Sequence, residues 1–299
     1  MHNSKVPLLR LGEELTTSEL VYLIIDLDRH HKIEEPHSPW QYYYARGLTE
    51  RHQRPGITRT DIPSLTTKQM IEVDRAMIED FQINLTQMME NAGRNLAHLA
   101  RRRFLENDPR GTNVFVLAGT GGNGGGALVA ARRLANYGAM VTVVTTRTAD
   151  SFKDIPRHQL KILKHMKIPI YQEEMPDTKG MDYNLIIDGI IGYSLRGAPR
   201  GSAARLIQWA NAQDSPILSL DVPSGLDGTT GAAFDPSIKA KATMTLALPK
   251  TGLMENKLES HVGELYVADL SVPPALYSGA NLELEVGLIF ARTDIVRLR

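Results

Sequence analysis

The chain has 299 residues, and 34 acidic side chains balance 34 basic ones, so the formal net charge is zero. This balance disfavours broad electrostatic binding to nucleic acid or to an acidic membrane surface. Cysteine is absent, which excludes disulfides, thiolate metal sites and a cysteine nucleophile. No apolar run approaches the ~18 residues that span a bilayer, and the first residues lack the apolar core of a secretory signal. We expect a soluble, cytoplasmic protein without a membrane or nucleic-acid partner.

Residues 1–60 differ in composition from the rest of the chain and predict an N-terminal extension. Five of the nine histidines lie before residue 53, and the stretch 36–56 is polar, aromatic and broken by proline. One helix is predicted at about 16–29, where Leu20, Ile24 and Leu27 recur at helical spacing. A single main domain is then expected over residues 61–299.

Two helices are predicted at the start of the main domain. Thr66 and Gln69 form a capping-box pattern, and apolar residues at 70, 73, 77 and 78 indicate a helix behind it. A second helix is expected from about Leu85 to Leu105. Their methionines suit a packed core better than a functional site.

Short apolar segments then alternate with helical patterns. Strands are predicted at Val114–Ala118, Met140–Thr146, Ile168–Gln172, Leu185–Asp188, Ile217–Asp221, Met244–Leu248 and Glu264–Ala268. Helices are predicted at about 125–137, 151–166 and 202–213. Nearly continuous apolar strands are typical of sheets covered on both faces, and the alternation predicts an α/β fold with a mostly parallel sheet.

The first candidate site is the glycine-rich segment 119–127, which reads GTGGNGGGA between a predicted strand and a predicted helix. Gly119, Gly121 and Gly124 satisfy the G-x-G-x-x-G pattern in the strand–turn–helix context that it requires. Glycines allow a phosphate to approach the backbone, and a helix N-terminus attracts negative charge. The alternative is a tight turn without a ligand; we expect a phosphate-type ligand.

The second predicted strand lacks the acidic residue that binds the ribose in an ordinary NAD-binding domain. It ends at Val144-Thr145-Thr146-Arg147, with no acid before Asp150. Arg147 either meets a 2′-phosphate or is a solvated loop residue, and the sequence favours neither. The pattern argues against a standard dehydrogenase.

Two further strands each end at an aspartate, Asp188 and Asp221. Ligands of open α/β sheets bind beyond the carboxyl ends of the strands, so both carboxylates could meet the Asn123 amide and the Ser224 hydroxyl in one crevice. These hard oxygen donors suit an alkali-type cation better than zinc. The alternative for Asp188 is a loop anchor or helix cap.

Taken together, these motifs resemble the YjeF N-terminal family, the NAD(P)H-hydrate epimerases. The resemblance covers the chain from about Ile62 onward. It rests on Met89-Glu90-Asn91-Ala92-Gly93, the glycine-rich segment, Asp188–Gly192, Asp221–Gly225 and Ala247-Leu248-Pro249-Lys250. It implies a Rossmann-like three-layer α/β/α sandwich, usually a homodimer, that interconverts the R and S epimers of hydrated NADH and NADPH.

The same resemblance assigns expected roles to residues of this chain. Asn123, Asp188 and Ser224 match ligands of a potassium ion. Two loops are expected to bind substrate: Gly122, Asn123, Gly124, Gly125 and Gly126 in the first, and Gly192, Tyr193, Ser194, Leu195, Arg196, Gly197 and Ala198 in the second. Asp221 matches a substrate-binding carboxylate. As general acid or base, Asp221 is the first candidate and Asp188 the second.

The glycine-rich segment departs from the family pattern G-P-G-N-N-G-G-D-G. Gly122 replaces the first asparagine, Gly126 the aspartate and Ala127 the last glycine. Because position 126 is expected to face the crevice, an acidic side chain would be missing from it. This leaves a second hypothesis, a non-catalytic relative that serves nucleotide sensing or dimeric scaffolding.

Overall fold

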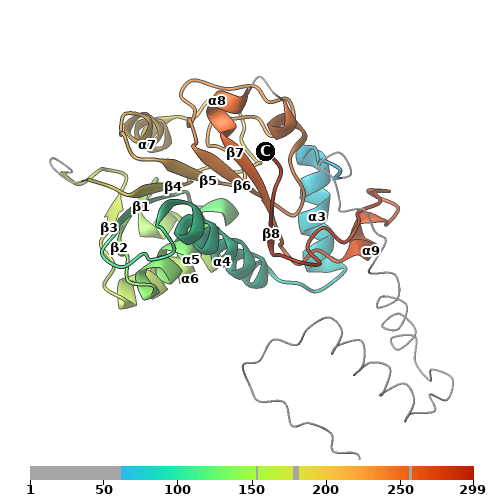
Figure 1. The fold of residues 1–299 in the computed structure, drawn as a ribbon, viewed down its shortest axis with the longest axis horizontal. Coiled ribbons are helices and arrows are strands. Elements are labelled where there is room, and N and C mark those ends of the chain that lie inside the picture. The colour runs from blue at the N-terminus through green and yellow to red at the C-terminus, as the bar shows by residue number, and fades with distance from the viewer. Residues whose placement is uncertain (1–61, 153, 178–181, 256–257) are drawn as a thin grey trace, which may run out of the picture. The chain divides into compact units, whose positions relative to one another are not determined.

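The computed structural model describes residues 62–152, 154–177, 182–255 and 258–299. The predicted N-terminal extension, its helix at 16–29 and the boundary at residue 60 lie outside these residues. Over the described ranges, strands and helices alternate around one mixed sheet (Figure 1), which confirms the α/β fold class. No described helix has both the length and the apolar character needed to cross a membrane.

The sheet has eight strands in the order β3-β2-β1-β4-β5-β6-β7-β8. Their bounds are β1 Asn113–Ala118, β2 Met140–Thr145, β3 Ile170–Gln172, β4 Leu185–Gly189, β5 Ile217–Leu220, β6 Ala242–Leu246, β7 Glu264–Ala268 and β8 Ile295–Arg297. All neighbours are parallel except β8, which pairs with β7 in the antiparallel sense. β8 was not predicted, because this three-residue edge strand has no periodic pattern of its own.

Two predicted strands end earlier than expected, for the same physical reason. Asp221 and Ala247, which directly follow β5 and β6, have left-handed backbone angles, with φ of 67° and 63°. A non-glycine residue seldom adopts this conformation, and it cannot continue a strand. β5 therefore ends at Leu220 and β6 at Leu246, so the Asp221 side chain starts a loop at the sheet edge.

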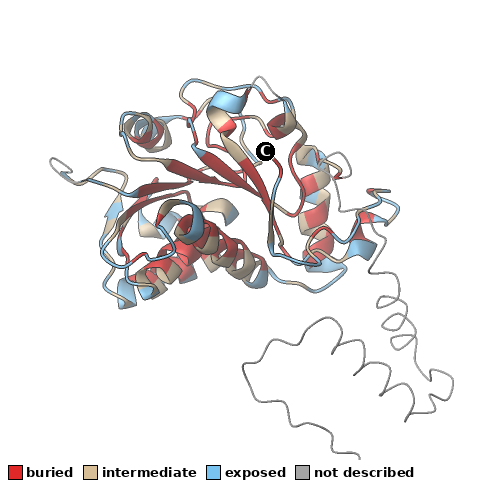
Figure 2. Cartoon of the chain, in the orientation of Figure 1, coloured by how far each residue is buried: buried red, intermediate tan, exposed pale blue. Residues whose placement is uncertain are grey.

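The helices cover the sheet in layers. Their bounds are α3 Thr67–Glu79, α4 Leu85–Phe104, α5 Gly122–Asn136, α6 Asp154–His165, α7 Gly201–Asn211, α8 Glu259–Val262 and α9 Pro274–Tyr277, with 3-10 turns η3 Ala149–Ser151 and η4 Thr251–Met254. Figure 1 shows α4, α5 and α6 on one face and α7 on the other. Buried strands lie between these layers (Figure 2), and the Thr66–Gln69 capping box is present.

The helix α5 begins at Gly122, three residues before the predicted start, so most of the glycine-rich segment belongs to its first turns. Close packing explains a helix built from poor helix formers. A Cβ on Gly124 would lie 1.8 Å from the Gly119 carbonyl oxygen, and one on Gly125 would lie 2.5 Å from the Met89 sulfur. Glycine therefore brings α5 against β1 and α4 and fixes the position of its N-terminus.

Candidate active site

A cavity of about 620 Å³ lies where the chain reverses its direction across the sheet, beyond the ends of β1 and β4. Ala118 is level with Thr145 and Gly189, so three neighbouring strands end at one edge. This reversal point is where open α/β sheets bind ligands. The walls include residues of α3, α4, the start of α5 and the loops after β1, β2, β4 and β5.

Six of the predicted site residues line this cavity: Gly122, Asn123, Gly192, Tyr193, Ser194 and Asp221. The other predicted residues are not among those that line it: Gly124, Gly125, Gly126, Leu195, Arg196, Gly197, Ala198, Asp188 and Ser224. Only the first residues of each predicted substrate-binding loop therefore line the cavity. The roles assigned to all these residues remain predictions.

The N-terminus of α5 opens into the cavity. Its cap residue is Gly121, which offers no side-chain hydrogen bond, and the first amides of an α-helix have no partner within the helix. A Cβ on Gly121 would meet no atom within 4 Å, so there is free space beside these amides. The arrangement suits a phosphate or another anion.

Asp188 does not line the cavity and is fully buried at the end of β4. Its carboxylate accepts hydrogen bonds from the Ser219 hydroxyl (2.8 Å), the Ser224 hydroxyl (2.6 Å) and amide (2.9 Å), and the Ile190 amide (3.2 Å). Burial raises the pKa of Asp188, while these hydrogen bonds act to lower it. Asp188 therefore ties the loops after β4 and β5 together.

Asn123 differs from Asp188 in having a buried amide group without partners. Neither its Oδ1 nor its Nδ2 makes a hydrogen bond within the described part of the chain. A buried polar group left without a hydrogen bond costs about 1–3 kcal/mol. A Cβ on Gly192 would lie 3.2 Å from Asn123 Cγ and 3.1 Å from Asp221 Oδ2, so the amide and the Asp221 carboxylate flank one glycine. A ligand that contacts this amide would remove the cost.

The donor set Asn123, Asp188 and Ser224 supplies one carboxylate, one amide and one hydroxyl oxygen. The unpartnered Asn123 oxygen fits a cation, and a single carboxylate suits a low charge. No group of three or more His, Cys, Asp or Glu side chains that could hold a metal occurs among the described residues. This chemistry is compatible with an alkali cation held by oxygens.

Asp221 presents its carboxylate to the cavity from the end of β5. Lys250 Nζ lies 2.5 Å from Asp221 Oδ1 and also donates to the Leu246 carbonyl oxygen at 2.8 Å. The Tyr193 amide donates to Asp221 Oδ2 at 3.0 Å. Lys250 is fully buried, so this ion pair is shielded from water on the side away from the cavity.

Tyr193 connects this ion pair to a second acid, Asp74 on α3. Its hydroxyl donates to Asp74 Oδ2 at 2.5 Å, and its ring lies 5.9 Å from Lys250 Nζ. Asp74 is half-buried and lines the cavity. Burial is the largest influence on the pKa of Asp74 and raises it, with the Tyr193 hydrogen bond acting in the opposite direction.

Asp74 and Lys250 were not predicted as site residues, although the sequence around each contains a signal. Met70, Asp74 and Ile78 recur every four residues and line the cavity together, so an acid interrupts an otherwise apolar helical stripe. Lys250 follows Pro249 in one of the motifs that carried the family resemblance. The long-range pairing of Lys250 with Asp221 could not be deduced from that motif.

Gly126, which was expected to face the crevice, is not among the residues that line the cavity. It is buried where α5 meets α4 and β5, and a Cβ there would lie 3.0 Å from Leu220 Cδ2 and 3.6 Å from Ala92 Cβ. Leu220 and Ala92 themselves line the cavity, so position 126 neighbours the cavity wall without being part of it. The missing acid therefore leaves the polar wall of the cavity intact.

Arg147 lines the cavity just after β2. Its side chain is 67% exposed, and its guanidinium group lies 3.8 Å from the Glu173 carboxylate. Such an exposed and loosely paired cation is available to a negatively charged ligand. A partner of a 2′-phosphate and a solvated loop residue, the two predicted alternatives for Arg147, are both compatible with this position.

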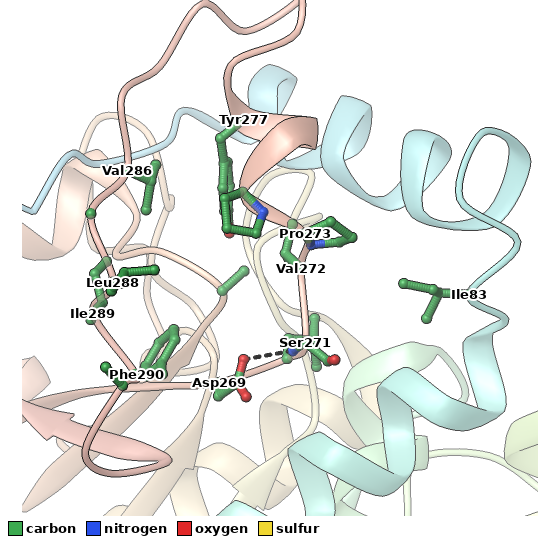
Figure 3. A pocket seen from close by; sticks show the side chains of 15 residues that line it. Ile83, Asp269, Ser271, Val272, Pro273, Tyr277, Val286, Leu288, Ile289 and Phe290 are labelled. Carbon is green, nitrogen blue, oxygen red and sulfur yellow. Dashed lines mark hydrogen bonds between the residues drawn. The ribbon is translucent and has the colours of Figure 1, made fainter. Parts of the chain in front are cut away.

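A second cavity of about 400 Å³ lies among the residues after β7 (Figure 3). Its wall is mostly apolar, with Ile83, Tyr277 and Phe290 among the side chains that line it. The Asp269 carboxylate there accepts the Ser271 amide at 2.7 Å. With its carboxylate used in a local turn, this cavity is the weaker candidate.

Comparison with known proteins identifies the family. The family described as YjeF-related protein N-terminus matches residues 85–252. A protein of Dehalogenimonas lykanthroporepellens named NAD(P)H-hydrate epimerase is 44% identical over 222 residues, 74% of this chain and 87% of that protein. One of Lentilactobacillus buchneri with the same name is 32% identical, over 74% of this chain and 99% of its own.

A solved structure agrees with these sequence matches. The crystal structure of the yeast protein ynu0, YNL200c, superimposes with a TM-score of 0.67 at 25% sequence identity, covering 79% of this chain and all of the yeast chain. The family match extends from the start of α4 to η4 and so includes the glycine-rich segment, Asp188, Asp221 and Lys250. The chain therefore belongs to the YjeF N-terminal family.

Proposed function

We propose that this protein is an NAD(P)H-hydrate epimerase, which interconverts the R and S forms of hydrated NADH and NADPH. The names of its relatives support this activity. The observation that carries it in this chain is the shared cavity: the α5 N-terminus, the Asn123 amide and the Asp221 carboxylate all line the same 620 Å³ space. An enzyme that epimerises a dinucleotide needs both an anion site for the phosphates and a site for acid–base chemistry.

The chemistry follows from the structure of the hydrated ring. The hydrated carbon carries a hydroxyl group beside the ring nitrogen, so the nitrogen lone pair can expel that hydroxyl if an acid protonates it. Water then returns to the opposite face. Proton transfer by a positioned side chain contributes about 10²–10⁴-fold to the rate of such a step. Asp221 is the primary candidate for general acid or base, because it lines the cavity while Lys250 and the Tyr193 amide hold its carboxylate.

The remaining residues hold the substrate. The α5 N-terminus would bind its phosphates, and correct placement of the reacting groups is itself a large catalytic contribution. A potassium ion would be held by Asn123, Asp188 and Ser224, where its charge favours the anionic dinucleotide. Asp188 would serve mainly as an anchor, because four protein donors already surround its carboxylate. The family resemblance supports a homodimer, which sedimentation equilibrium can test.

The alternative, a non-catalytic scaffold, was suggested by the missing acid at position 126, a buried position beside Leu220 and Ala92. One experiment separates the two functions. The protein is incubated with the purified R epimer of hydrated NADPH, and the S epimer is followed by chromatography. Equilibration faster than in buffer supports the epimerase. Equilibration at the buffer rate, with a folded protein, would refute it.

A further inference from the structure

The cavity holds a second carboxyl group on a different wall from Asp221. Asp74 comes from α3, in the middle of the stripe Met70, Asp74 and Ile78, whereas Asp221 follows β5. Tyr193 contacts both acids, because its hydroxyl donates to Asp74 Oδ2 at 2.5 Å and its amide to Asp221 Oδ2 at 3.0 Å. One residue thus holds both carboxyl groups at the same cavity.

The surroundings of the two acids differ in charge. Asp221 forms an ion pair with the buried Lys250, whose Nζ lies 2.5 Å from Asp221 Oδ1. No basic side chain forms a salt bridge with Asp74 among the described residues. Its helical neighbour Arg75 pairs instead with Glu72, Glu79 and Asp80. The apolar residues of the same stripe, Met70 and Ile78, favour a neutral carboxyl group at position 74.

The charged groups that face Asp74 act in both directions. Burial and the nearby Asp221 raise the pKa of Asp74, while the Tyr193 hydroxyl and the Lys250 charge lower it, and the net change is upward. Burial and the Asp74 charge raise the pKa of Tyr193, which keeps it a neutral hydrogen-bond donor. Asp221 is thus paired with a buried lysine and Asp74 is not, and such different surroundings of two carboxyl groups in one site are the usual basis for separate roles as acid and base.

We propose that Asp74 is a catalytic residue of the epimerisation, the acid that protonates the departing ring hydroxyl while the Asp221 carboxylate acts as the base. This inference rests on the proposed function. In the forward step, the Asp74 proton moves to the hydroxyl oxygen, the C–O bond breaks, and the ring-nitrogen lone pair forms a C=N⁺ bond. In the return step, a water oxygen bonds to the same carbon on the opposite face. The electron pair returns to nitrogen, and Asp221 takes the water proton.

The proton count of these two reaction steps predicts that Asp74 and Asp221 share one proton. One turnover moves a proton from Asp74 to Asp221, and the opposite epimer uses the same two groups in reverse. The active enzyme therefore carries one proton on the two acids. A rate that falls on both sides of an optimum pH is the expected signature of such an acid–base pair.

The test measures kcat and KM in both directions with the separated R and S epimers of hydrated NADPH. Asp74→Asn should lower kcat by about 10²–10⁴-fold, by the same factor in each direction, and leave KM within a few fold. Glu79→Gln, on the exposed side of the same helix, is the matched control and should keep the activity. Circular dichroism and binding of NADP⁺ by calorimetry show whether each variant is folded and binds a dinucleotide.

A second variant separates catalysis from a structural role. Tyr193→Phe removes the hydrogen bond that lowers the pKa of Asp74, so the high-pH limb of the rate profile should move to higher pH. An unmoved limb, or an Asp74→Asn protein with kcat within threefold of wild type, would overturn the role of Asp74. If wild-type protein itself does not accelerate epimerisation, the proposed function fails instead, and the two failures are distinct.

Discussion

Lys250 Nζ lies 2.5 Å from Asp221 Oδ1, and the two residues are 0% and 5% exposed at their side chains. They come from loops that follow adjacent parallel strands, β5 and β6. Lys250 also lies beside the Leu65 segment, since the Leu65 amide donates to the Pro249 carbonyl oxygen at 2.8 Å and the Thr251 amide to the Leu65 oxygen at 2.9 Å. This buried pair therefore joins the wall of the 620 Å³ cavity to the first described residues of the chain.

Lys250→Met should destabilise the protein strongly, because it leaves the Asp221 charge buried without its partner. Removing one member of a buried pair costs about 3–5 kcal/mol. Urea unfolding measures the loss, with Lys239→Met, an exposed lysine, as the control. The double variant Asp221→Asn/Lys250→Met should recover part of the loss, since no unpaired charge remains. A double variant as unstable as the sum of the single ones would show that the pair is not coupled.

Asn123→Ala tests the proposed potassium site without an activity assay. Because the Asn123 amide makes no hydrogen bond within the described structure, its removal should cost little stability in a buffer of tetramethylammonium chloride. Potassium chloride at equal ionic strength should raise the Tm of the wild type, since a ligand of the folded state stabilises it, and should not raise that of Asn123→Ala. Equal Tm values of the wild type in both salts would contradict the site.

Acid should weaken the contact between α4 and the start of β7. The Arg103 guanidinium donates to both Glu264 oxygens, at 2.6 and 2.9 Å, and lowers the pKa of Glu264 from 4.5 to about 2. A lowered pKa in the folded state means that the stabilisation is complete above pH 4.5 and is lost as pH falls toward 2. Since Arg103 is 41% exposed, the effect should stay below about 1 kcal/mol.

Glu264→Gln should therefore be less stable than wild type at pH 7 and equally stable near pH 2, as measured by urea unfolding across this range. Glu285→Gln, an exposed glutamate outside this cluster, provides the control. A deficit that does not change with pH would assign the Glu264 effect to packing.

The order of elements was predictable from the sequence, because apolar strands such as 114–118 and helical patterns such as 85–105 carry their own periodicity. It was also predictable that strands end at the glycine-rich segment, Asp188 and Asp221, because the apolar strands before them could be located. The contacts of Asp74 and Lys250 with the site were not predictable, since α3 and the loop after β6 meet Tyr193 and Asp221 only through long-range packing. The burial of Gly126 was not predictable either, because it depends on how closely α4 packs against α5.

Arg147→Ala should raise KM for hydrated NADPH by up to about fivefold, because an exposed ion pair contributes about 0.2–1 kcal/mol. The effect should be smaller for hydrated NADH, which lacks one phosphate group. Arg110→Ala, at a position 80% exposed and away from the cavity, is the control. An equal increase for both substrates would place the arginine near a phosphate that they share.

Gly126→Asp introduces the acidic residue that the family resemblance implies at this position, and we expect it to destabilise the protein. The new Cβ would lie 3.0 Å from Leu220 Cδ2, so that side chain must shift, and overpacking of a core typically costs about 1–3 kcal/mol. Gly126→Ala makes the same steric demand without charge, and the higher helix propensity of alanine offsets part of it. The difference in unfolding free energy between these two variants isolates the carboxylate.

That difference should depend on pH with a definite sign. A carboxyl group buried beside Leu220 and Ala92 has a raised pKa in the folded state. It therefore keeps its proton above the pH at which the unfolded chain releases it, and stability falls as pH rises above ~4. Gly126→Asp should thus lose more stability relative to Gly126→Ala at pH 7 than at pH 4, with no gain in epimerase activity. A constant difference together with a higher kcat would show that the new carboxylate reaches the cavity past Leu220.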